Sequence, residues 1–387
     1  MLKRIYLSVA ILVIAVVIFY NSVERTPLVA DDNTEFAKAV VLQVLNEDLL
    51  DDGEYAGTQE VTLRITSGTY KGEVVEGTSM NGYLYGAYCT EGQKVIVRLS
   101  VYEESISATV YNYDRELPIA ILVLIFLALM WIVGGKRGIH SIVALVFTFL
   151  IVLMLYLPML YLGFSPFFAA VICVGLITVI SILLIGGVST KSLCAIIGTV
   201  SGVVAAGLIA LIFGTVAHID GYKFSNVETL IYVQQNSNLN VSGILFSSIL
   251  ISALGAVMDV AMSVSSSLTE IHEKTPELPV RELFRSGMRI GRDMIGTMSN
   301  TLILAYVGNS ANILIVIYAY SYPLHQVLNM YDIGIQIMQG LSGTMGIILT
   351  VPIVSAVSAA MLVREGKKKT AIAKAAAGGK TLDEKRK

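Results

Sequence analysis

Long apolar stretches recur along this chain, and they constrain its fold more than any other feature of the sequence. A helix needs roughly 20 apolar residues to cross a hydrocarbon layer about 30 Å thick. Eight stretches approach or exceed that length, at about 5–20, 118–134, 140–161, 167–187, 193–216, 243–265, 295–318 and 341–363. We therefore predict an α-helical polytopic membrane protein with about eight transmembrane helices, whose first partner is the lipid bilayer.

Charge is scarce and unevenly placed. Charged residues make up 14% of the chain and hydrophobic residues 55%, a balance that disfavours a soluble globular protein. Residues 21–117 hold 17 acidic and 7 basic residues. If the eight stretches alternate in direction, 19 of the other 20 basic residues fall on one side, and only Lys223 falls on the other. The positive-inside rule then predicts that both termini are cytoplasmic and that residues 21–117 are outside.

The first apolar stretch follows Lys3 and Arg4, the arrangement of an export signal. A cleaved signal peptide is one interpretation of residues 1–22. The sequence NSVERTPL that follows lacks a small-residue cleavage pattern, which favours a retained transmembrane anchor.

Residues 30–116 alternate between apolar and polar side chains, which is typical of strands. The alternation is clear in QEVTLRIT, KVIVRLSV and SISATVYN, and two further strands are indicated near AVVLQVLNE and GEVVEGT. Five short strands punctuated by glycine predict a small exported β-barrel, of the OB-like type. The excess of acid argues against nucleic acid as a partner of this domain, so we expect a lid, docking or assembly role.

Reactive groups are few. Cys89, Cys173 and Cys194 form no paired spacing, and the loop around His218 matches no defined metal site. No metalloprotease motif, Ser/His pair at membrane depth or phosphate-binding glycine loop is present. We therefore expect no enzyme activity, no metal and no cofactor.

The stretch 243–265 carries the main functional signal. Ser248, Ser252, Gly255, Asp259, Ser263 and Ser266 recur at spacings of 4, 3, 4, 4 and 3, which places them on one helical face. An ionised Asp at the centre of a membrane costs at least about 2.5–3.5 kcal/mol, so such an acid usually faces a bundle interior or a wet cavity. Asp259 is either a proton-relay group or a structural carboxylate held by nearby serines or by the amide of Asn300.

Residues 268–292 read as a cytoplasmic amphipathic segment, and the next apolar stretch opens with polar residues. Asn300 lies about eight residues inside it, or ~12 Å at 1.5 Å per residue, which is close to the depth of Asp259 in its own helix. The candidate transport residues are therefore Asp259, Asn300, Ser299, Thr301, Ser263 and Ser252.

The last apolar stretch contains Pro352, which removes one backbone hydrogen bond and suggests a broken helix. The seven-helix membrane domain is expected to cover 118–365. Residues 366–387 are predicted to form a basic, weakly structured cytoplasmic tail.

Two motifs, GAVMDVAMSVSSSLTEIHEK and SGMRIGRDMIGTMSNTLILAYVG, resemble the YibE/F-like family of bacterial multi-span membrane proteins over about residues 120–365. The resemblance implies a bacterial cell-membrane protein. The chain is also similar, more distantly, to the permease core of the resistance-nodulation-division superfamily, with Asp259 at the position of its intramembrane acid. It departs from that pattern because Met258 and Val260, not a second acid, flank Asp259.

These observations lead us to expect a proton-coupled secondary transporter, or an accessory of membrane export, in which Asp259 relays protons. Its substrate would be a small molecule or an ion. The alternative is a non-transporting assembly or scaffold protein whose external domain binds a partner. In either role the chain could form a homo-oligomer, or a hetero-oligomer with a related membrane protein.

Overall fold

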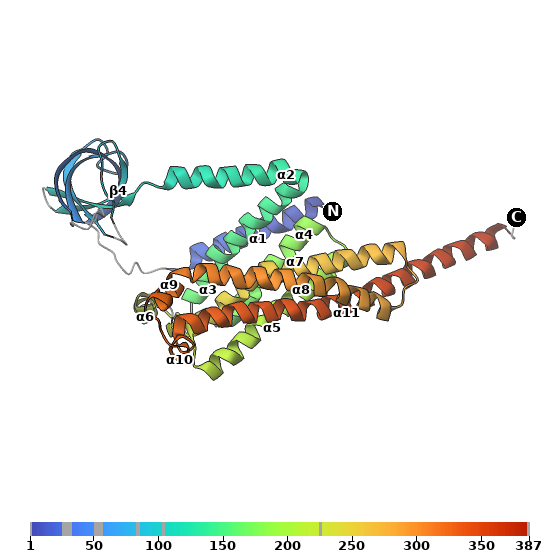
Figure 1. Cartoon of the computed structure of the whole chain (residues 1–387). Coiled ribbons are helices and arrows are strands. Elements are labelled where there is room, and N and C mark those ends of the chain that lie inside the picture. The colour runs from blue at the N-terminus through green and yellow to red at the C-terminus, as the bar shows by residue number, and fades with distance from the viewer. Residues whose placement is uncertain are drawn as a thin grey trace. The chain divides into compact units, whose positions relative to one another are not determined.

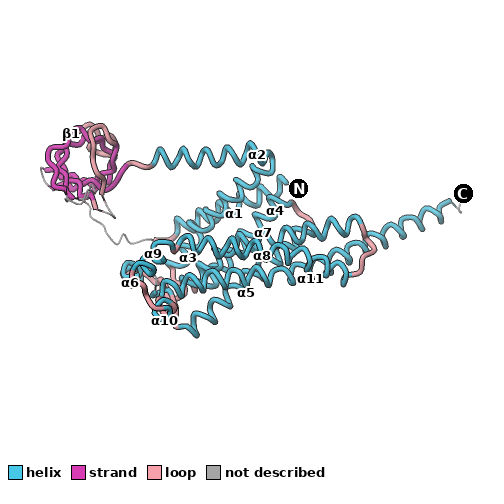
Figure 2. Tube along the Cα trace, in the orientation of Figure 1, coloured by secondary structure: helices cyan, strands magenta, loops and turns pink. Residues whose placement is uncertain are grey.

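The computed structural model describes residues 2–24, 33–49, 57–82, 86–102, 105–223 and 227–384. The chain divides into two compact units, which are considered separately. One unit comprises Met1–Arg25 and Gly134–Lys387, and the other comprises Thr26–Val133. Figure 1 shows the elements along the chain, and Figure 2 separates the helices from the strands.

Five strands in the second unit form a closed barrel in the order β1-β2-β3-β5-β4. They are β1 (Thr34–Leu49), β2 (Gly57–Ile65), β3 (Val74–Asn81), β4 (Lys94–Tyr102) and β5 (Ser105–Tyr113). Only the pairing of β3 with β5 is parallel among the described strands. The long β1 closes the barrel because Ala39 lies opposite both Ile65 of β2 and Val95 of β4.

The barrel core is built from the residues that alternation selects. Val61, Leu63 and Ile65 are buried on β2, and Val95, Val97 and Leu99 are buried on β4. The prediction of a small five-stranded barrel is confirmed. Its finer classification as OB-like stays a prediction.

Outside the barrel, the described residues form eleven α-helices, one short π-helix (η1) and one short 3-10 helix (η2). They are α1 (Leu2–Ser22), α2 (Glu116–Ile151), η1 (Val152–Tyr156), α3 (Leu157–Tyr161), α4 (Pro166–Gly186), α5 (Thr190–Ala217), η2 (Gly221–Lys223), α6 (Val227–Gln235), α7 (Ile244–Lys274), α8 (Val280–Asn309), α9 (Ala311–Ala319), α10 (Leu324–Val327) and α11 (Tyr331–Glu384).

Five of the described helices are long and apolar enough to cross a membrane, or six if α8 and α9, bent by 63°, form one broken span. The count differs from eight for two reasons. The apolar part of α1, Tyr6–Ser22, is short, and Glu116–Tyr161 runs as one helical stretch. That stretch changes direction at Gly135, whose φ of +54° is open to glycine and costly for other residues. The expectation that the chain crosses the membrane eight times stays a prediction.

Three other elements differ from the sequence-based expectation. Residues 268–292 are not a separate segment, because 268–274 end α7 and 280–292 open α8 without a break. The helix α11 continues through Pro352, where packing on several sides outweighs the loss of one backbone hydrogen bond. The helix also continues to Glu384 instead of giving way to a weakly structured tail.

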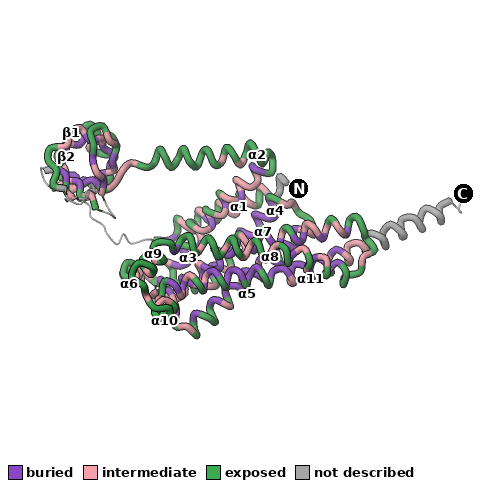
Figure 3. Tube along the Cα trace, viewed as in Figure 1, coloured by how far each residue is buried: buried purple, intermediate pink, exposed green. Residues whose placement is uncertain are grey.

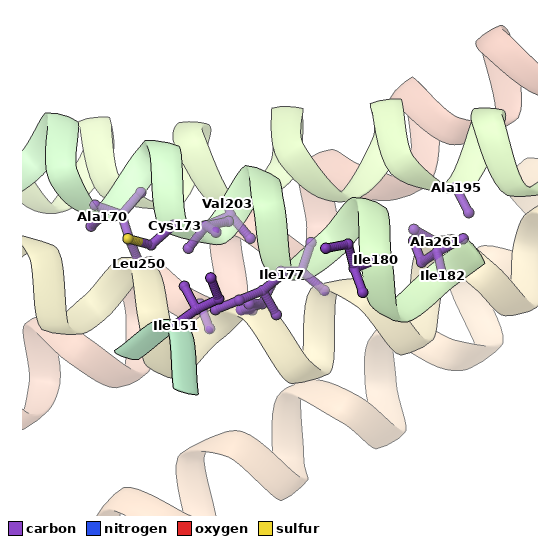
Figure 4. Packing of buried hydrophobic residues seen from close by; sticks show 14 of the residues in the cluster. Ile151, Ala170, Cys173, Ile177, Ile180, Ile182, Ala195, Val203, Leu250 and Ala261 are labelled. Carbon is purple, nitrogen blue, oxygen red and sulfur yellow. The ribbon is translucent and has the colours of Figure 1, made fainter. Parts of the chain in front are cut away.

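The bundle core lies where α11 packs against α5, α7 and α8. Small residues permit these close contacts: Gly198 faces Val354, and Gly346 faces Ala206. Buried side chains of α4, α5 and α7 fill the adjoining space, as Figure 4 shows for Ile177, Val203, Leu250 and Ala261. Figure 3 shows many buried residues on α4, α5, α7 and α11, whereas much of α8 is exposed.

Candidate functional site

The polar face predicted on α7 is a surface of the helical unit. Ser252, Gly255, Asp259 and Ser263 are exposed. The other side of α7 is buried in the core and comprises Ala253, Leu254, Val257, Val260, Ala261 and Val264. We call Ser248, Ser252, Gly255, Asp259, Ser263 and Ser266 the α7 stripe. Periodicity defines a face and not what covers it, so the expectation that Asp259 faces a bundle interior or a wet cavity stays a prediction, while in the single chain the side chain is exposed.

The carboxylate of Asp259 stands alone. Among the described residues it accepts no hydrogen bond and forms no ion pair, and the same is true of the side chains of Ser263, Ser266 and Asn300. The contacts proposed for a structural carboxylate, to nearby serines or to Asn300, are therefore not formed. This arrangement leaves the carboxylate available to exchange a proton or to meet a ligand.

Contacts between α7 and α8 fix the relative depth of the candidate residues. Ser252 Oγ lies 2.9 Å from the hydroxyl of Tyr306 near one end of the helix pair. Leu268 packs against Gly287 nearer the other end. Interpolation between these antiparallel contacts places Asp259 at about the level of Thr297, so Asn300 is displaced by only ~4 Å along the axis. Equal depth is thus a good approximation, although no contact joins the two side chains.

Two of the four polar residues that open the second half of α8 bond within their own helix. Thr297 Oγ1 donates to the carbonyl of Met294 at 3.1 Å, and Thr301 Oγ1 donates to the carbonyl of Thr297 at 2.9 Å. Asn300 is exposed. The hydroxyl of Ser299 is buried and has no hydrogen-bond partner among the described residues. Of the four, Ser299 and Asn300 retain unused hydrogen-bonding capacity.

Two cavities adjoin the end of the α7 stripe that is farther from Lys274. The first has a volume of about 460 Å³, and its lining includes Tyr156, Ser248 and Ser252. The second, of about 290 Å³, is lined in part by Tyr306 and Gln336. The bond between Ser252 and Tyr306 therefore joins a residue of one cavity to a residue of the other. Sequence reasoning missed Tyr306, because a tyrosine within an apolar stretch carries no distinctive signal.

The site offers no evident metal centre within the described ranges. No group of three or more His, Cys, Asp or Glu side chains is close enough together to hold a metal ion there. The three thiols, Cys89, Cys173 and Cys194, are free and buried. The α7 stripe presents one carboxylate and several hydroxyls, groups that can bind a proton or a polar ligand.

A comparison with protein families identified one match. The sequence model of a family described as "YibE/F-like protein" matches residues 122–364, which is more than half of the chain and includes all of α7 and α8. Comparisons with curated proteins and with solved structures gave no match.

Proposed function

The chain belongs to the YibE/F-like family, and from that premise we propose that it is a membrane-embedded, proton-coupled secondary transporter or an accessory of membrane export. Its five or six long apolar helices support a location in the bilayer. We propose no enzymatic reaction for this chain. The substrate would be a small molecule or an ion that moves along the α7 stripe.

The observation that carries this proposal is the unpartnered carboxylate of Asp259 on a polar stripe of an otherwise apolar helix. A structural acid at membrane depth would be stabilised by hydrogen bonds or a counter-charge, because an isolated ionised carboxylate there is costly. Asp259 has neither among the described residues. Protonation removes the charge, so proton uptake and release can be coupled to whether the stripe faces lipid or water.

The route would begin at the cavity lined by Ser248 and Ser252 and continue along the stripe to Asp259. Ser263 lies one turn beyond Asp259 on the same face. The hydroxyl of Ser252 is bound to Tyr306, so this bond would have to open or rotate for a polar group to pass. Buried Ser299 could supply a hydrogen bond from α8.

We further propose the bacterial cell membrane as the location, with both termini inside and the β-barrel outside. The one-sided distribution of basic residues supports this orientation. A single introduced cysteine at position 285 should resist an impermeant thiol reagent in intact cells and react in inverted vesicles. Labelling of this cysteine in intact cells would show that the protein has the opposite orientation.

The relay proposal is tested with purified protein in liposomes that contain a pH-sensitive dye. Under an imposed pH gradient and a permeant counter-ion, we expect proton flux from the wild-type protein and at least a tenfold loss in Asp259→Asn. The matched control is Asp332→Asn, which removes an exposed acid at the start of α11 and should leave the flux unchanged. Equal flux from wild type and Asp259→Asn would refute the relay.

A scaffold role is the second candidate, and one feature of the barrel favours it. The side chains of Phe36 on β1 and Tyr111 on β5 are both exposed and form an edge-to-face pair with ring centroids 5.4 Å apart. Exposed aromatic pairs are typical anchors of protein interfaces. If docking is the main role, Phe36→Ala with Tyr111→Ala should abolish co-purification of a cross-linked partner, whereas Asp259→Asn should not.

A further inference from the structure

Four arginines form an exposed row on the first half of α8. Arg281, Arg285, Arg289 and Arg292 follow one another at spacings of 4, 4 and 3, so they share one helical face over about 16 Å. We call them the α8 arginine row. All four are exposed, and none forms an ion pair with a carboxylate among the described residues. The row is therefore free to bind an anion from outside the chain.

The opposite face of α8 is held in place by close packing. Leu283 is fully buried. Gly287 approaches Leu268 of α7 and Ser355 of α11 so closely that an added Cβ would lie 2.6 Å from Ser355 Oγ. At Gly291 an added Cβ would lie 2.1 Å from Val351. Because these glycines fix the rotation of α8 about its axis, the arginine row must face outward.

The surface changes character along the same helix. Beyond the arginine row, the exposed residues of α8 include Ile303, Leu304 and Val307. Gly291 meets Val351 and Gly287 meets Ser355, so α8 and α11 run in opposite directions. Val351 is 13 residues before Arg364, or ~20 Å along α11. The arginine row therefore begins near the end of the bundle that carries Arg364, and α8 runs from there toward the apolar surface. A ligand that covers both parts must combine an anionic group with an apolar body.

We propose that the α8 arginine row binds the phosphate groups of anionic phospholipids. Guanidinium groups bind phosphate oxygens through paired hydrogen bonds and are suited to this ligand more than to a diffuse counter-ion. The acyl chains of the same lipid would lie along Ile303, Leu304 and Val307. A soluble nucleic acid has no acyl chain with which to cover that surface. The inference rests on the proposed membrane location but not on proton transport by Asp259.

The test uses the full-length protein purified in detergent and titrated with short-chain phosphatidylglycerol or phosphatidylcholine. Binding is followed by native mass spectrometry and by the shift in melting temperature. We expect phosphatidylglycerol to bind at least tenfold more tightly than phosphatidylcholine. The triple variant Arg285→Gln, Arg289→Gln, Arg292→Gln should lose this preference. Its matched control is Lys367→Gln, Lys368→Gln, Lys369→Gln, which removes the same charge from the basic C-terminal segment and should keep the preference.

Two outcomes would overturn the proposal: an unchanged lipid preference in the arginine variant, or an equal loss in the lysine control. Tighter binding of a short RNA or a polyglutamate peptide than of phosphatidylglycerol would also overturn it. If the triple variant does not fold, Arg289→Gln alone should weaken phosphatidylglycerol binding measurably, and no change would again refute the proposal. Proton flux measured on the same preparations separates this result from the relay, because lipid preference can fail while the effect of Asp259→Asn persists.

Discussion

The hydroxyl of Tyr306 on α8 lies 2.9 Å from Ser252 Oγ on α7, at the place where two cavities approach the α7 stripe. Ser252 Oγ also lies 3.1 Å from the carbonyl oxygen of Ile249 in its own helix. When the serine donates to that carbonyl, its oxygen can accept from Tyr306. The pair is thus a connection between two helices that make few other polar contacts in the described part of the chain.

We expect Ser252→Ala and Tyr306→Phe each to lower the free energy of unfolding slightly. Hydrogen bonds between helices in membranes contribute about 0.6 kcal/mol on average, so the two effects should be coupled by roughly that amount. A double-mutant cycle on detergent-solubilised protein measures the coupling. Tyr318→Phe serves as the control, because its exposed hydroxyl has no hydrogen-bond partner among the described residues. Strict additivity of Ser252→Ala and Tyr306→Phe would contradict the assignment.

Two glycines of α8 should respond differently to alanine. At Gly291 an added Cβ would lie 2.1 Å from Val351, so Gly291→Ala should destabilise the protein by about 1–3 kcal/mol through overpacking. At Gly296 an added Cβ meets open space. Gly296→Ala should therefore be neutral or stabilising by up to about 1 kcal/mol, because alanine is the better helix former. Melting temperatures in detergent compare the two, and equal effects would argue against the α8–α11 packing.

The barrel should fold without the helices. It has a closed sheet and its own buried core, and it belongs to a separate compact unit. Residues 30–116 expressed alone are expected to be soluble and monodisperse, with a β-rich circular dichroism spectrum and cooperative thermal unfolding. A disordered or helical spectrum would mean that the barrel needs the rest of the chain.

Cys89 gives the barrel a predictable response to pH. The side chain is buried, and burial raises the pKa of its thiol above the ordinary value of 9.0. The folded domain therefore holds the proton at pH values where the unfolded chain releases it. This contribution to stability is fully present below pH 9 and is lost as the pH rises through the raised pKa of the folded state.

We expect the melting temperature of the isolated barrel to fall from pH 8.5 to pH 10.5 more steeply in the wild type than in Cys89→Ala. The alanine variant lacks the thiol and serves as the reference for all other groups. Alkylation of Cys89 by iodoacetamide at pH 8 should be slow until denaturant unfolds the domain. Rapid alkylation of the folded domain would show that the thiol is accessible.

Much of the fold is predictable because local patterns decide it. The alternation through Val61, Leu63 and Ile65 identifies β2 and its buried face, since a strand with one buried side must alternate. The break between α8 and α9 at Ser310 could not be predicted in this way. The apolar pattern continues across it, and the direction of a chain depends on contacts that no local pattern contains.

The candidate site was predictable to the same degree. Helical spacing correctly groups Ser252, Asp259 and Ser263 on one face, and helix length places Asn300 near the depth of Asp259. Whether that face is covered depends on the angle between neighbouring helices. The role of Tyr306 was not predictable either, because its partner lies 54 residues away in the sequence.

Tyr306 also stands at the start of the bend. Its carbonyl oxygen accepts hydrogen bonds from the backbone nitrogen of Ser310 at 3.1 Å and from Ser310 Oγ at 2.9 Å. One tyrosine thus holds α7 through its side chain and the α8–α9 corner through its backbone. Because both sets of hydrogen bonds end on Tyr306, the side-chain contact with α7 and the α8–α9 corner are anchored at the same residue of α8.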